Sequence, residues 1–253
     1  MTGVIIAPPN LKGWHNVPLS DILYKAFGVP VFVGNDANVA ALAETVMGAA
    51  QGFRHVIYIT VSTGIGGGVL IDGKMLLGKT GAGAECGHII IQSSPAPIRL
   101  ELETSGPYLA LKAKTRIEKG EQSVIKDIVN SDLNQISGAT VGKAALAGDA
   151  LALDIVHEAG RILGLGMVTL LHLFNPEILV FGGSVSDNLG ELLWKPMRKS
   201  IQKYCIDDSY WRDLQIVPAA LGDNVSIFGA AALVITKGGV TDVNEAITHL
   251  KTV

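Results

Sequence analysis

A glycine-rich run between two apolar segments constrains this chain more than any other feature. Residues 56–61 are β-branched or aromatic and lead into Thr63-Gly64-Ile65-Gly66-Gly67-Gly68, and a second apolar segment then ends at Asp72-Gly73, a two-residue hairpin signal. Glycines let backbone N–H groups converge on an anion without obstruction by Cβ, and Ser62 and Thr63 add hydroxyl donors. The run predicts either a phosphate-binding turn between two strands or a hairpin whose glycines serve only tight packing.

Side chains suited to catalysis lie on both sides of this run. Upstream, the apolar residues 29–33 end at Asn35-Asp36, and downstream a glycine-rich segment ends with Glu85 and His88. A carboxylate at the end of a strand can orient a hydroxyl and take its proton during phosphoryl transfer. Carboxylate and imidazole groups both bind vicinal hydroxyls, although they are also metal-ligand types. The order predicts sugar phosphorylation with Asp36 as base, and the structural alternative for Asp36 is a helix N-cap.

Composition excludes several classes of protein. The chain has 253 residues, 48 % of them hydrophobic, which suffices for one large or two modest domains. A net charge of −3 gives no basic surface for nucleic acid or an acidic membrane. Cys86 and Cys205 form no disulfide framework and no signal peptide is evident, so we expect a cytoplasmic protein. The apolar stretch 151–174 carries Asp154, His157, Glu158 and Arg161, and it therefore predicts a buried helix instead of a membrane span.

Alternating strand and helix signals predict an α/β fold with mixed sheets. The expected strands are 4–7, 31–33, the hairpin 56–73, 88–91, 177–184 and 214–218. The expected helices are 18–27, 38–47, 105–118, one that starts at Gly138, 151–174, 188–203 and 226–234.

Six motifs in a fixed order resemble the ROK family of sugar kinases and repressors, from residue 4 to about 235, and the ATP-dependent glucokinases of that family look most similar. The motifs are Pro9-Asn10-Leu11-Lys12-Gly13-Trp14, Asn35-Asp36-Ala37-Asn38, Thr63-Gly64-Ile65-Gly66-Gly67-Gly68, Gly83-Ala84-Glu85-Cys86-Gly87-His88, Phe181-Gly182-Gly183-Ser184, and Leu221-Gly222-Asp223-Asn224 before Gly229-Ala230-Ala231.

The resemblance implies an actin-like ATPase (ribonuclease H-like) fold of two lobes, with ATP on one side of a cleft and a hexose deep inside. Residues 1–36 would be the remnant of the N-terminal lobe and 37–253 the C-terminal lobe, with the last helix packing back on the former. Asp36 would activate the 6-hydroxyl of the sugar, most simply glucose. The sugar-binding residues would be Asn10, Asn35, Asp36, Glu85, His88 and Glu101. The ATP-binding residues would be Thr63, Gly64, Gly66, Gly67, Gly182 and Gly183, with Mg²⁺ bridging phosphate oxygens.

The chain departs from the family pattern at its start. The family begins with an Asp-x-Gly-Gly-Thr hairpin and most of an N-terminal lobe, whereas Met1 here lies almost directly before the Pro-Asn loop. We therefore expect exposed strand edges and apolar faces near Val4 and Val31. Four explanations of this departure stay open: a fragment, a mis-started reading frame, a lobe supplied by another chain, or self-association over this surface. Whether this chain has kinase activity by itself is therefore the question that follows.

A second departure concerns zinc. The family pattern Cys-x-Cys-Gly-x-x-Gly-Cys-x-Glu binds structural zinc together with a histidine, but residues 92–101 contain no cysteine here. Cys86 and His88 cannot complete a tetrahedral site, so we expect no zinc. Glu101 keeps its place before Ser105-Gly106. Because a metal normally fixes the ligand ring, the sequence does not define how His88 is oriented.

Three functions follow from these patterns. The first is a glucokinase-type hexose kinase, for which the family resemblance implies a homodimer, and the second is an N-acetylmannosamine kinase or fructokinase of the same fold. The third is a non-catalytic sugar-sensing module, since the family includes repressors. Those repressors carry an N-terminal helix-turn-helix that this sequence lacks, and the intact Asp36 favours phosphoryl transfer.

Overall fold

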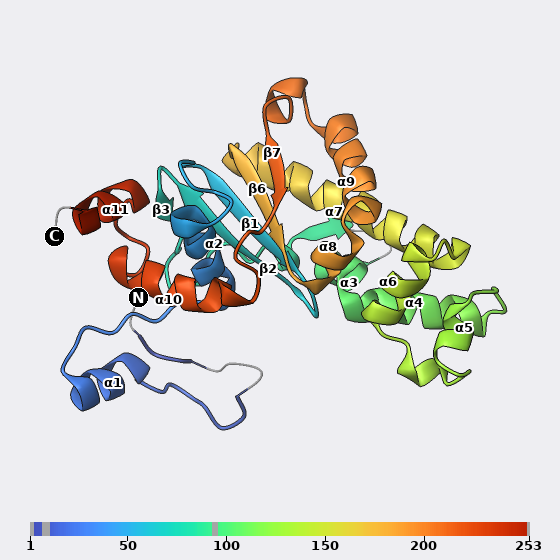
Figure 1. The fold of residues 1–253 in the computed structure, drawn as a ribbon, viewed down its shortest axis with the longest axis horizontal. Coiled ribbons are helices and arrows are strands. Elements are labelled where there is room, and N and C mark those ends of the chain that lie inside the picture. The colour runs from blue at the N-terminus through green and yellow to red at the C-terminus, as the bar shows by residue number, and fades with distance from the viewer. Residues whose placement is uncertain (1–2, 7–10, 93–95, 252–253) are drawn as a thin grey trace. The chain divides into compact units, whose positions relative to one another are not determined.

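The computed structural model describes residues 3–6, 11–92 and 96–251, which fold into two compact units (Figure 1). The first unit contains Met1–Tyr58, Gly68–Ala84 and Ala219–Val253, and the second contains Ile59–Gly67 and Glu85–Pro218. The lobe boundary expected at residue 36 stays a prediction. In the described residues no helix is long and apolar enough to cross a membrane.

The main sheet has five strands in the hydrogen-bonded order β3-β2-β1-β6-β7, and the unit boundary passes through β1 and β2. The strands are β1 (Val56–Val61), β2 (Ile65–Ile71), β3 (Lys74–Met75), β6 (Ile178–Gly182) and β7 (Gln215–Pro218). β2 and β3 pair antiparallel, with Leu70 opposite Met75. Asp72 and Gly73 have φ of 53° and 74°, as a type I′ hairpin turn requires. The predicted hairpin is confirmed.

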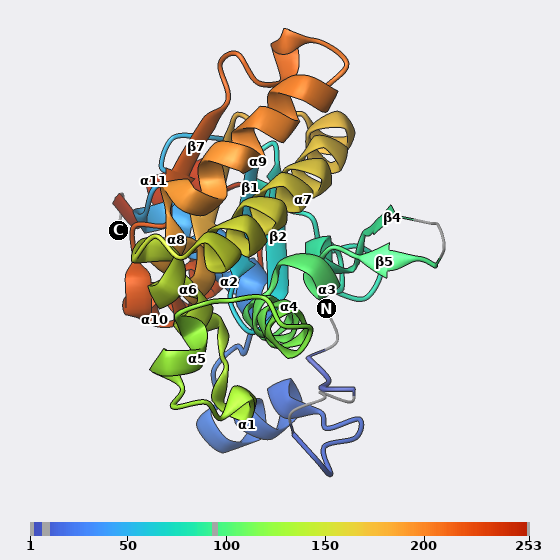
Figure 2. The same ribbon diagram turned by 90° about the vertical axis from the view of Figure 1, so that its right-hand side faces the viewer.

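The second unit is mainly helical. Its helices are α3 (Glu101–Thr104), α4 (Gly106–Glu118), α5 (Ile125–Ile128), α6 (Gly138–Leu146), α7 (Ala150–Phe174), α8 (Ser184–Leu189) and α9 (Glu191–Tyr204). α7 and α9 lie side by side (Figure 2). Gly160 permits this close approach, because a Cβ at that position would lie only 2.3 Å from the Leu193 carbonyl oxygen. α7 ends at Asn175, which adopts the left-handed conformation with φ of 42°. The expected long helix and its end are confirmed.

A two-stranded sheet in the second unit positions several candidate site residues. β4 (Ile90–Gln92) pairs antiparallel with β5 (Ile98–Arg99), and Ile90 lies opposite Arg99. The strand expected at 88–91 therefore starts later, because residues Cys86–His88 form a 3₁₀ turn instead.

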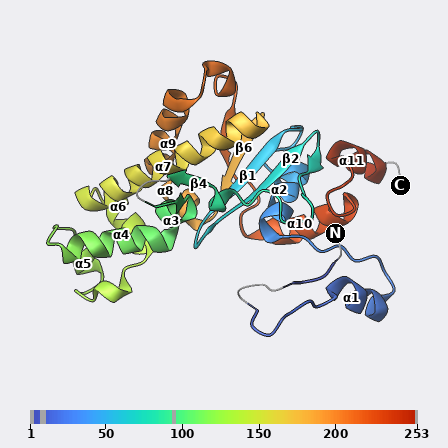
Figure 3. The same ribbon diagram turned by 180° about the vertical axis from the view of Figure 1, so that it is seen from behind.

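The helices of the first unit are α1 (Leu19–Phe27), α2 (Asp36–Met47), α10 (Val225–Ile235) and α11 (Val243–Lys251). α10 packs against α2 (Figure 3), and a Cβ at Gly229 would lie 2.7 Å from the Val39 carbonyl oxygen. α11 also contacts α2 and was not among the expected elements.

Three expectations were wrong. Within the described part of residues 4–7, the strand is reduced to a single bridge between Ile5 and Val17, and Ala7 lies outside the described residues. Residues 31–33 are half-exposed and form no strand, since no described segment pairs with them and an unpaired apolar run has no ladder to stabilise it. The helix expected over 188–203 is broken at Gly190, whose φ is 46°.

Candidate functional site

The turn expected over Thr63–Gly68 is shorter in the structure: only residues 62–64, here called the glycine turn, join β1 to β2, and Gly66, Gly67 and Gly68 lie in β2 because the strand starts at Ile65. The hydrogen bonds that close this turn lie within the second unit. The Ser62 N–H donates to the Gly64 carbonyl at 2.9 Å, and the Gly106 N–H donates to the Ser62 carbonyl at 2.8 Å. The Ser62 and Ser184 hydroxyls lie 3.2 Å apart. Thr63 is exposed at the tip. The start of α4 therefore holds the turn, and Thr63 is left accessible to a ligand.

Glu101 is bound directly to this turn. Its Oε2 accepts a hydrogen bond from the Ile65 N–H at 3.0 Å. A Cβ at Gly64 would lie 2.7 Å from the same oxygen. Glycine at position 64 leaves the space that this carboxylate occupies, and a side chain there would displace the carboxylate. The structure thus brings together a predicted sugar-binding residue and a predicted ATP-binding residue.

Glu85 and His88 share the 3₁₀ turn that precedes β4. The His88 N–H donates to the Glu85 carbonyl at 3.1 Å, and both side chains are exposed. A Cβ at Gly87 would lie 2.2 Å from the Ile65 carbonyl oxygen, so this turn packs closely on the start of β2. The two predicted residues are therefore fixed beside the strand that leaves the glycine turn.

Arg99 is a candidate residue that the sequence reasoning missed. Its Nη1 lies 3.0 Å from His88 Nδ1. The Leu100 N–H donates to the Ile89 carbonyl at 3.0 Å and holds the two segments in register. Apart from His88, Arg99 is the only basic residue between Lys79 and Lys112. This isolated positive charge near His88 is the sequence feature that could have identified Arg99 as a candidate.

Asp36 and Asn35 lie at the start of α2 in the first unit. Asn35 is the N-cap, and its Oδ1 accepts from the N–H groups of Ala37 at 3.0 Å and Asn38 at 3.3 Å. Asp36 is the first helical residue, is exposed, and its Oδ1 accepts from the Ala37 N–H at 2.8 Å. The capping role thus belongs mainly to Asn35, and the carboxylate of Asp36 stays accessible. Asn10 lies outside the described residues.

Gly68, a residue of β2 in the first unit, contacts α2. A Cβ at Gly68 would lie 2.9 Å from the Ala37 carbonyl oxygen and 2.5 Å from the Ala41 Cβ. The helix that begins with Asp36 therefore packs on the part of β2 that belongs to the same unit.

Gly182 and Gly183 end β6. Gly183 has φ of 90°, and a Cβ there would lie 2.6 Å from the Val61 carbonyl oxygen. Position 183 therefore requires glycine, both for its backbone conformation and for its close packing against Val61. Gly183 is followed at once by α8, several of whose residues line a cavity.

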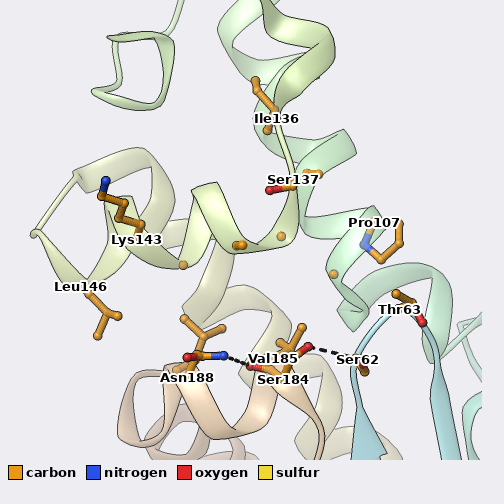
Figure 4. A pocket seen from close by; sticks show the side chains of 16 residues that line it. Ser62, Thr63, Pro107, Ile136, Ser137, Lys143, Leu146, Ser184, Val185 and Asn188 are labelled. Atoms are coloured by element: carbon orange, nitrogen blue, oxygen red, sulfur yellow. Dashed lines mark hydrogen bonds between the residues drawn. The ribbon is translucent and has the colours of Figure 1, made fainter. Parts of the chain in front are cut away.

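This cavity has a volume of about 690 Å³ and lies within the second unit (Figure 4). It is lined by Ser62, Thr63, Gly106, Pro107, Ala110, Ile136, Ser137, Gly138, Ala139, Gly142, Lys143, Leu146, Ser184, Val185, Asn188 and Leu189. Thr63 and Lys143 lie on opposite sides, and Lys143 is the only charged residue among these described lining residues. Its volume is in the range of cofactor pockets, and its walls combine apolar side chains with a few hydroxyls. A nucleoside can be accommodated here, beside a turn that can bind phosphate.

Cys86 is a buried free cysteine in the turn that carries His88. Burial raises the pKa of its thiol to about 12, with a further contribution from the nearby charge of Glu85. The burial that raises this pKa disfavours the thiolate, which is the form that zinc binds. Over the ranges 3–6, 11–92 and 96–251, no three His, Cys, Asp or Glu side chains are grouped to hold a metal ion.

The family model, a curated relative and two solved structures all indicate the same family for this chain. The ROK family model matches residues 1–237. A glucokinase from Thermotoga maritima is 34 % identical over 239 residues, which cover 92 % of this chain and 74 % of the relative. The crystal structure of a ROK family glucokinase from Streptomyces griseus, in complex with glucose and AMPPNP, superposes with a TM-score of 0.78 at 34 % identity over 92 % of this chain and 76 % of that one. A ROK family transcriptional regulator, a homologue of the E. coli MLC protein, gives a TM-score of 0.83 at 28 % identity and covers 98 % and 62 % of the two chains.

These similarities establish the fold as the α/β actin-like ATPase fold of the ROK sugar kinases. The chain spans about three quarters of the length of the two glucokinases. Since the family model matches almost the whole chain, the protein belongs to the ROK family.

Proposed function

We propose that the protein is a sugar kinase that transfers the γ-phosphate of ATP to the 6-hydroxyl of a hexose, with glucose as the first candidate. The observation that carries this proposal is the hydrogen bond between Glu101 and Ile65, the residue that directly follows the glycine turn. A kinase must hold the acceptor sugar next to the phosphate chain, and most of its catalysis comes from that positioning. One contact here joins a carboxylate suited to sugar hydroxyls with a turn suited to phosphate. The glucokinase from T. maritima and the glucose and AMPPNP bound by the S. griseus enzyme support the choice of substrates.

Asp36 would act as the general base. Its carboxylate is exposed at the start of α2, where Asn35 already caps the helix. A carboxylate within reach of the acceptor hydroxyl can orient it and accept its proton as the bond to phosphorus forms. Asn35, Glu85, His88 and Glu101 would bind the other sugar hydroxyls, together with Asn10.

The ATP phosphates would be bound at Thr63, Gly64, Gly66 and Gly67 through backbone N–H groups and the Thr63 hydroxyl. The nucleoside would occupy the 690 Å³ cavity, where Gly182 and Gly183 allow α8 to begin beside the glycine turn. Mg²⁺ supplied with ATP would bridge phosphate oxygens and offset their charge.

A coupled assay of ADP release tests this function. The purified chain is incubated with Mg²⁺-ATP and glucose, N-acetylmannosamine, fructose or buffer alone. We expect turnover that depends on glucose, whereas faster turnover with another sugar would assign the N-acetylmannosamine kinase or fructokinase alternative. Absence of turnover with every sugar, in a protein that is folded by circular dichroism, would contradict the kinase proposal for this chain.

A non-catalytic sugar-sensing role is the second candidate. The similarity to the ROK transcriptional regulator, which covers 98 % of this chain, favours it. Titration calorimetry with the same sugars, combined with the ADP assay, distinguishes a sensor from a kinase. A sensor binds sugar and shows no ATP turnover, whereas a kinase shows both. A homodimer, which the family resemblance implies, also stays a prediction, and sedimentation velocity would test it.

A further inference from the structure

We propose that Arg99 is a positioning residue that fixes the ring orientation and the tautomer of His88, so that Nε2 carries the proton and donates it in a hydrogen bond to a sugar hydroxyl. The role in sugar binding rests on the proposed function. The assignment of the ring itself rests on the contact between Arg99 Nη1 and His88 Nδ1 at 3.0 Å.

The tautomer follows from the chemistry of the two groups. A guanidinium carries five N–H donors and no acceptor, and it stays protonated in proteins. A neutral imidazole has one donor nitrogen and one acceptor nitrogen. Because Arg99 can only donate, His88 Nδ1 must be the acceptor, and the ring proton must lie on Nε2. A doubly protonated ring would place two donors against each other at this contact.

The backbone makes this contact a built feature. Arg99 is half-buried in β5, and its pairing with Ile90 brings it beside the turn that carries His88. That turn is itself held by the His88–Glu85 backbone hydrogen bond. Both partners are therefore positioned by strand and turn hydrogen bonds and not by side-chain packing alone.

The same short segment also carries Glu101. Leu100, which separates it from Arg99, is fully buried and hydrogen-bonded to Ile89, and Glu101 contacts the glycine turn. Residues 99–101 thus supply the Glu101 carboxylate as a hydrogen-bond acceptor. Through the contact of Arg99 with His88, the same residues also orient an imidazole donor. A sugar hydroxyl can donate to the first and accept from the second.

The consequence for binding is specific to the sugar. A ring that is free to turn, or that presents an unprotonated nitrogen, loses a hydrogen bond to a hydroxyl oxygen. A lost hydrogen bond of ordinary strength weakens binding about tenfold. Binding of ATP does not use this ring and should not change.

The test compares Arg99→Met, which removes the donor, with Arg99→Lys, which keeps one. We expect Arg99→Met to raise KM for glucose about tenfold with KM for ATP unchanged, and Arg99→Lys to restore most of the loss. Arg161→Met is the matched control, because Arg161 is an exposed arginine of α7 in the same unit, and it should leave both constants unchanged.

Long-range ¹H–¹⁵N correlation spectra of the imidazole rings give a readout that a purely structural role would not move. His88 is assigned by its loss in His88→Gln. We expect the wild-type ring to have a protonated Nε2 and an unprotonated Nδ1, and Arg99→Met to show a mixture of tautomers. A proton on Nδ1 in the wild type, or unchanged spectra and glucose KM in Arg99→Met, would overturn the proposal.

The spectra need no substrate, so the two proposals fail separately. If the wild type neither binds nor phosphorylates any sugar but shows the expected tautomer, the proposed function and the sugar-binding role of Arg99 fail together, while the ring assignment holds. If glucose turnover is present and Arg99→Met has no effect, only the positioning role fails.

Discussion

The Glu44 carboxylate accepts hydrogen bonds from the Ala220 N–H at 3.0 and 3.1 Å, although the two residues are 176 positions apart in the sequence. Glu44 is completely buried in α2 and also accepts from the N–H groups of Leu221 at 3.0 Å and Ala49 at 2.8 Å. A buried carboxylate is tolerated only when its oxygens are fully hydrogen-bonded. This contact joins α2 to the loop that leads into α10, and therefore holds together the helix pair of the first unit.

Replacement of Glu44 by glutamine should lower the free energy of unfolding by about 2–4 kcal/mol, because an NH₂ group would face backbone donors and leave them unsatisfied. Urea denaturation followed by circular dichroism measures the change. Glu118→Gln is the control, since Glu118 is exposed on α4 and lies 3.9 Å from Lys114. That change should cost less than about 0.5 kcal/mol. Equal effects of the two substitutions would contradict the anchoring role of Glu44.

Asp36→Asn should lower kcat for glucose phosphorylation by about 10²–10⁴-fold, because the amide cannot accept the proton of the hydroxyl. Glucose binding, measured by calorimetry, should persist, since the amide still hydrogen-bonds to hydroxyls. Asp21→Asn, an exposed aspartate in the first turn of α1, should leave both unchanged. Loss of binding together with turnover would remove the special support for Asp36 as base.

Ala139→Trp should raise KM for ATP by tenfold or more, because Ala139 lines the cavity and the indole would fill part of it. KM for glucose should stay within about twofold. Ala147→Trp provides the comparison, since Ala147 is exposed at the end of the same helix and does not line the cavity. If both substitutions affect ATP equally, the nucleoside lies elsewhere.

The raised pKa of Cys86 predicts a loss of stability at alkaline pH. The unfolded thiol ionises near its ordinary pKa of 9.0, while the folded thiol remains protonated up to about 12. The folded state therefore holds more protons between these values, and its stability falls as pH rises through that window. From pH 9 to 10 the wild type should lose about 1 kcal/mol more than Cys86→Ala, as measured by urea denaturation at each pH. Parallel pH profiles would show that burial does not suppress this ionisation.

Local signals account for the part of the fold that the sequence predicted correctly. Asp72-Gly73 encodes its hairpin through two positive φ angles, and Asn175 ends α7 in the same conformation. Residues 31–33 have an equally good strand pattern, but a strand also needs a hydrogen-bonded neighbour, which no local pattern supplies. The helix break at Gly190 depended on a single glycine inside an otherwise helical segment, where glycine is usually tolerated.

The candidate site also contains residues that local sequence patterns identified and features that depend on the three-dimensional structure. Glu85 and His88 were identified because their residue types and order suit sugar binding, and Glu101 because of its place in the family pattern; the roles of all three stay predictions. Arg99 was missed because its importance comes from strand pairing with Ile90 and not from its neighbours in sequence. In the zinc pattern quoted for the family, Arg99 stands where the last cysteine would be if Glu101 is the final glutamate. The cavity was missed because its walls come from four separate segments of the chain.

The close packing of α7 has a consequence for the order of folding. Three glycines lie inside this 25-residue helix, and two of them, Gly160 and Gly164, touch the backbone of α9, while Gly166 touches Leu100. Each glycine weakens an isolated helix by about 1 kcal/mol relative to alanine. Alanine at these positions would make a peptide of α7 more helical but would force its neighbours apart in the protein. This helix, the longest in the described part of the chain, is therefore a poor nucleus by itself and acquires its helicity from the partners that it contacts.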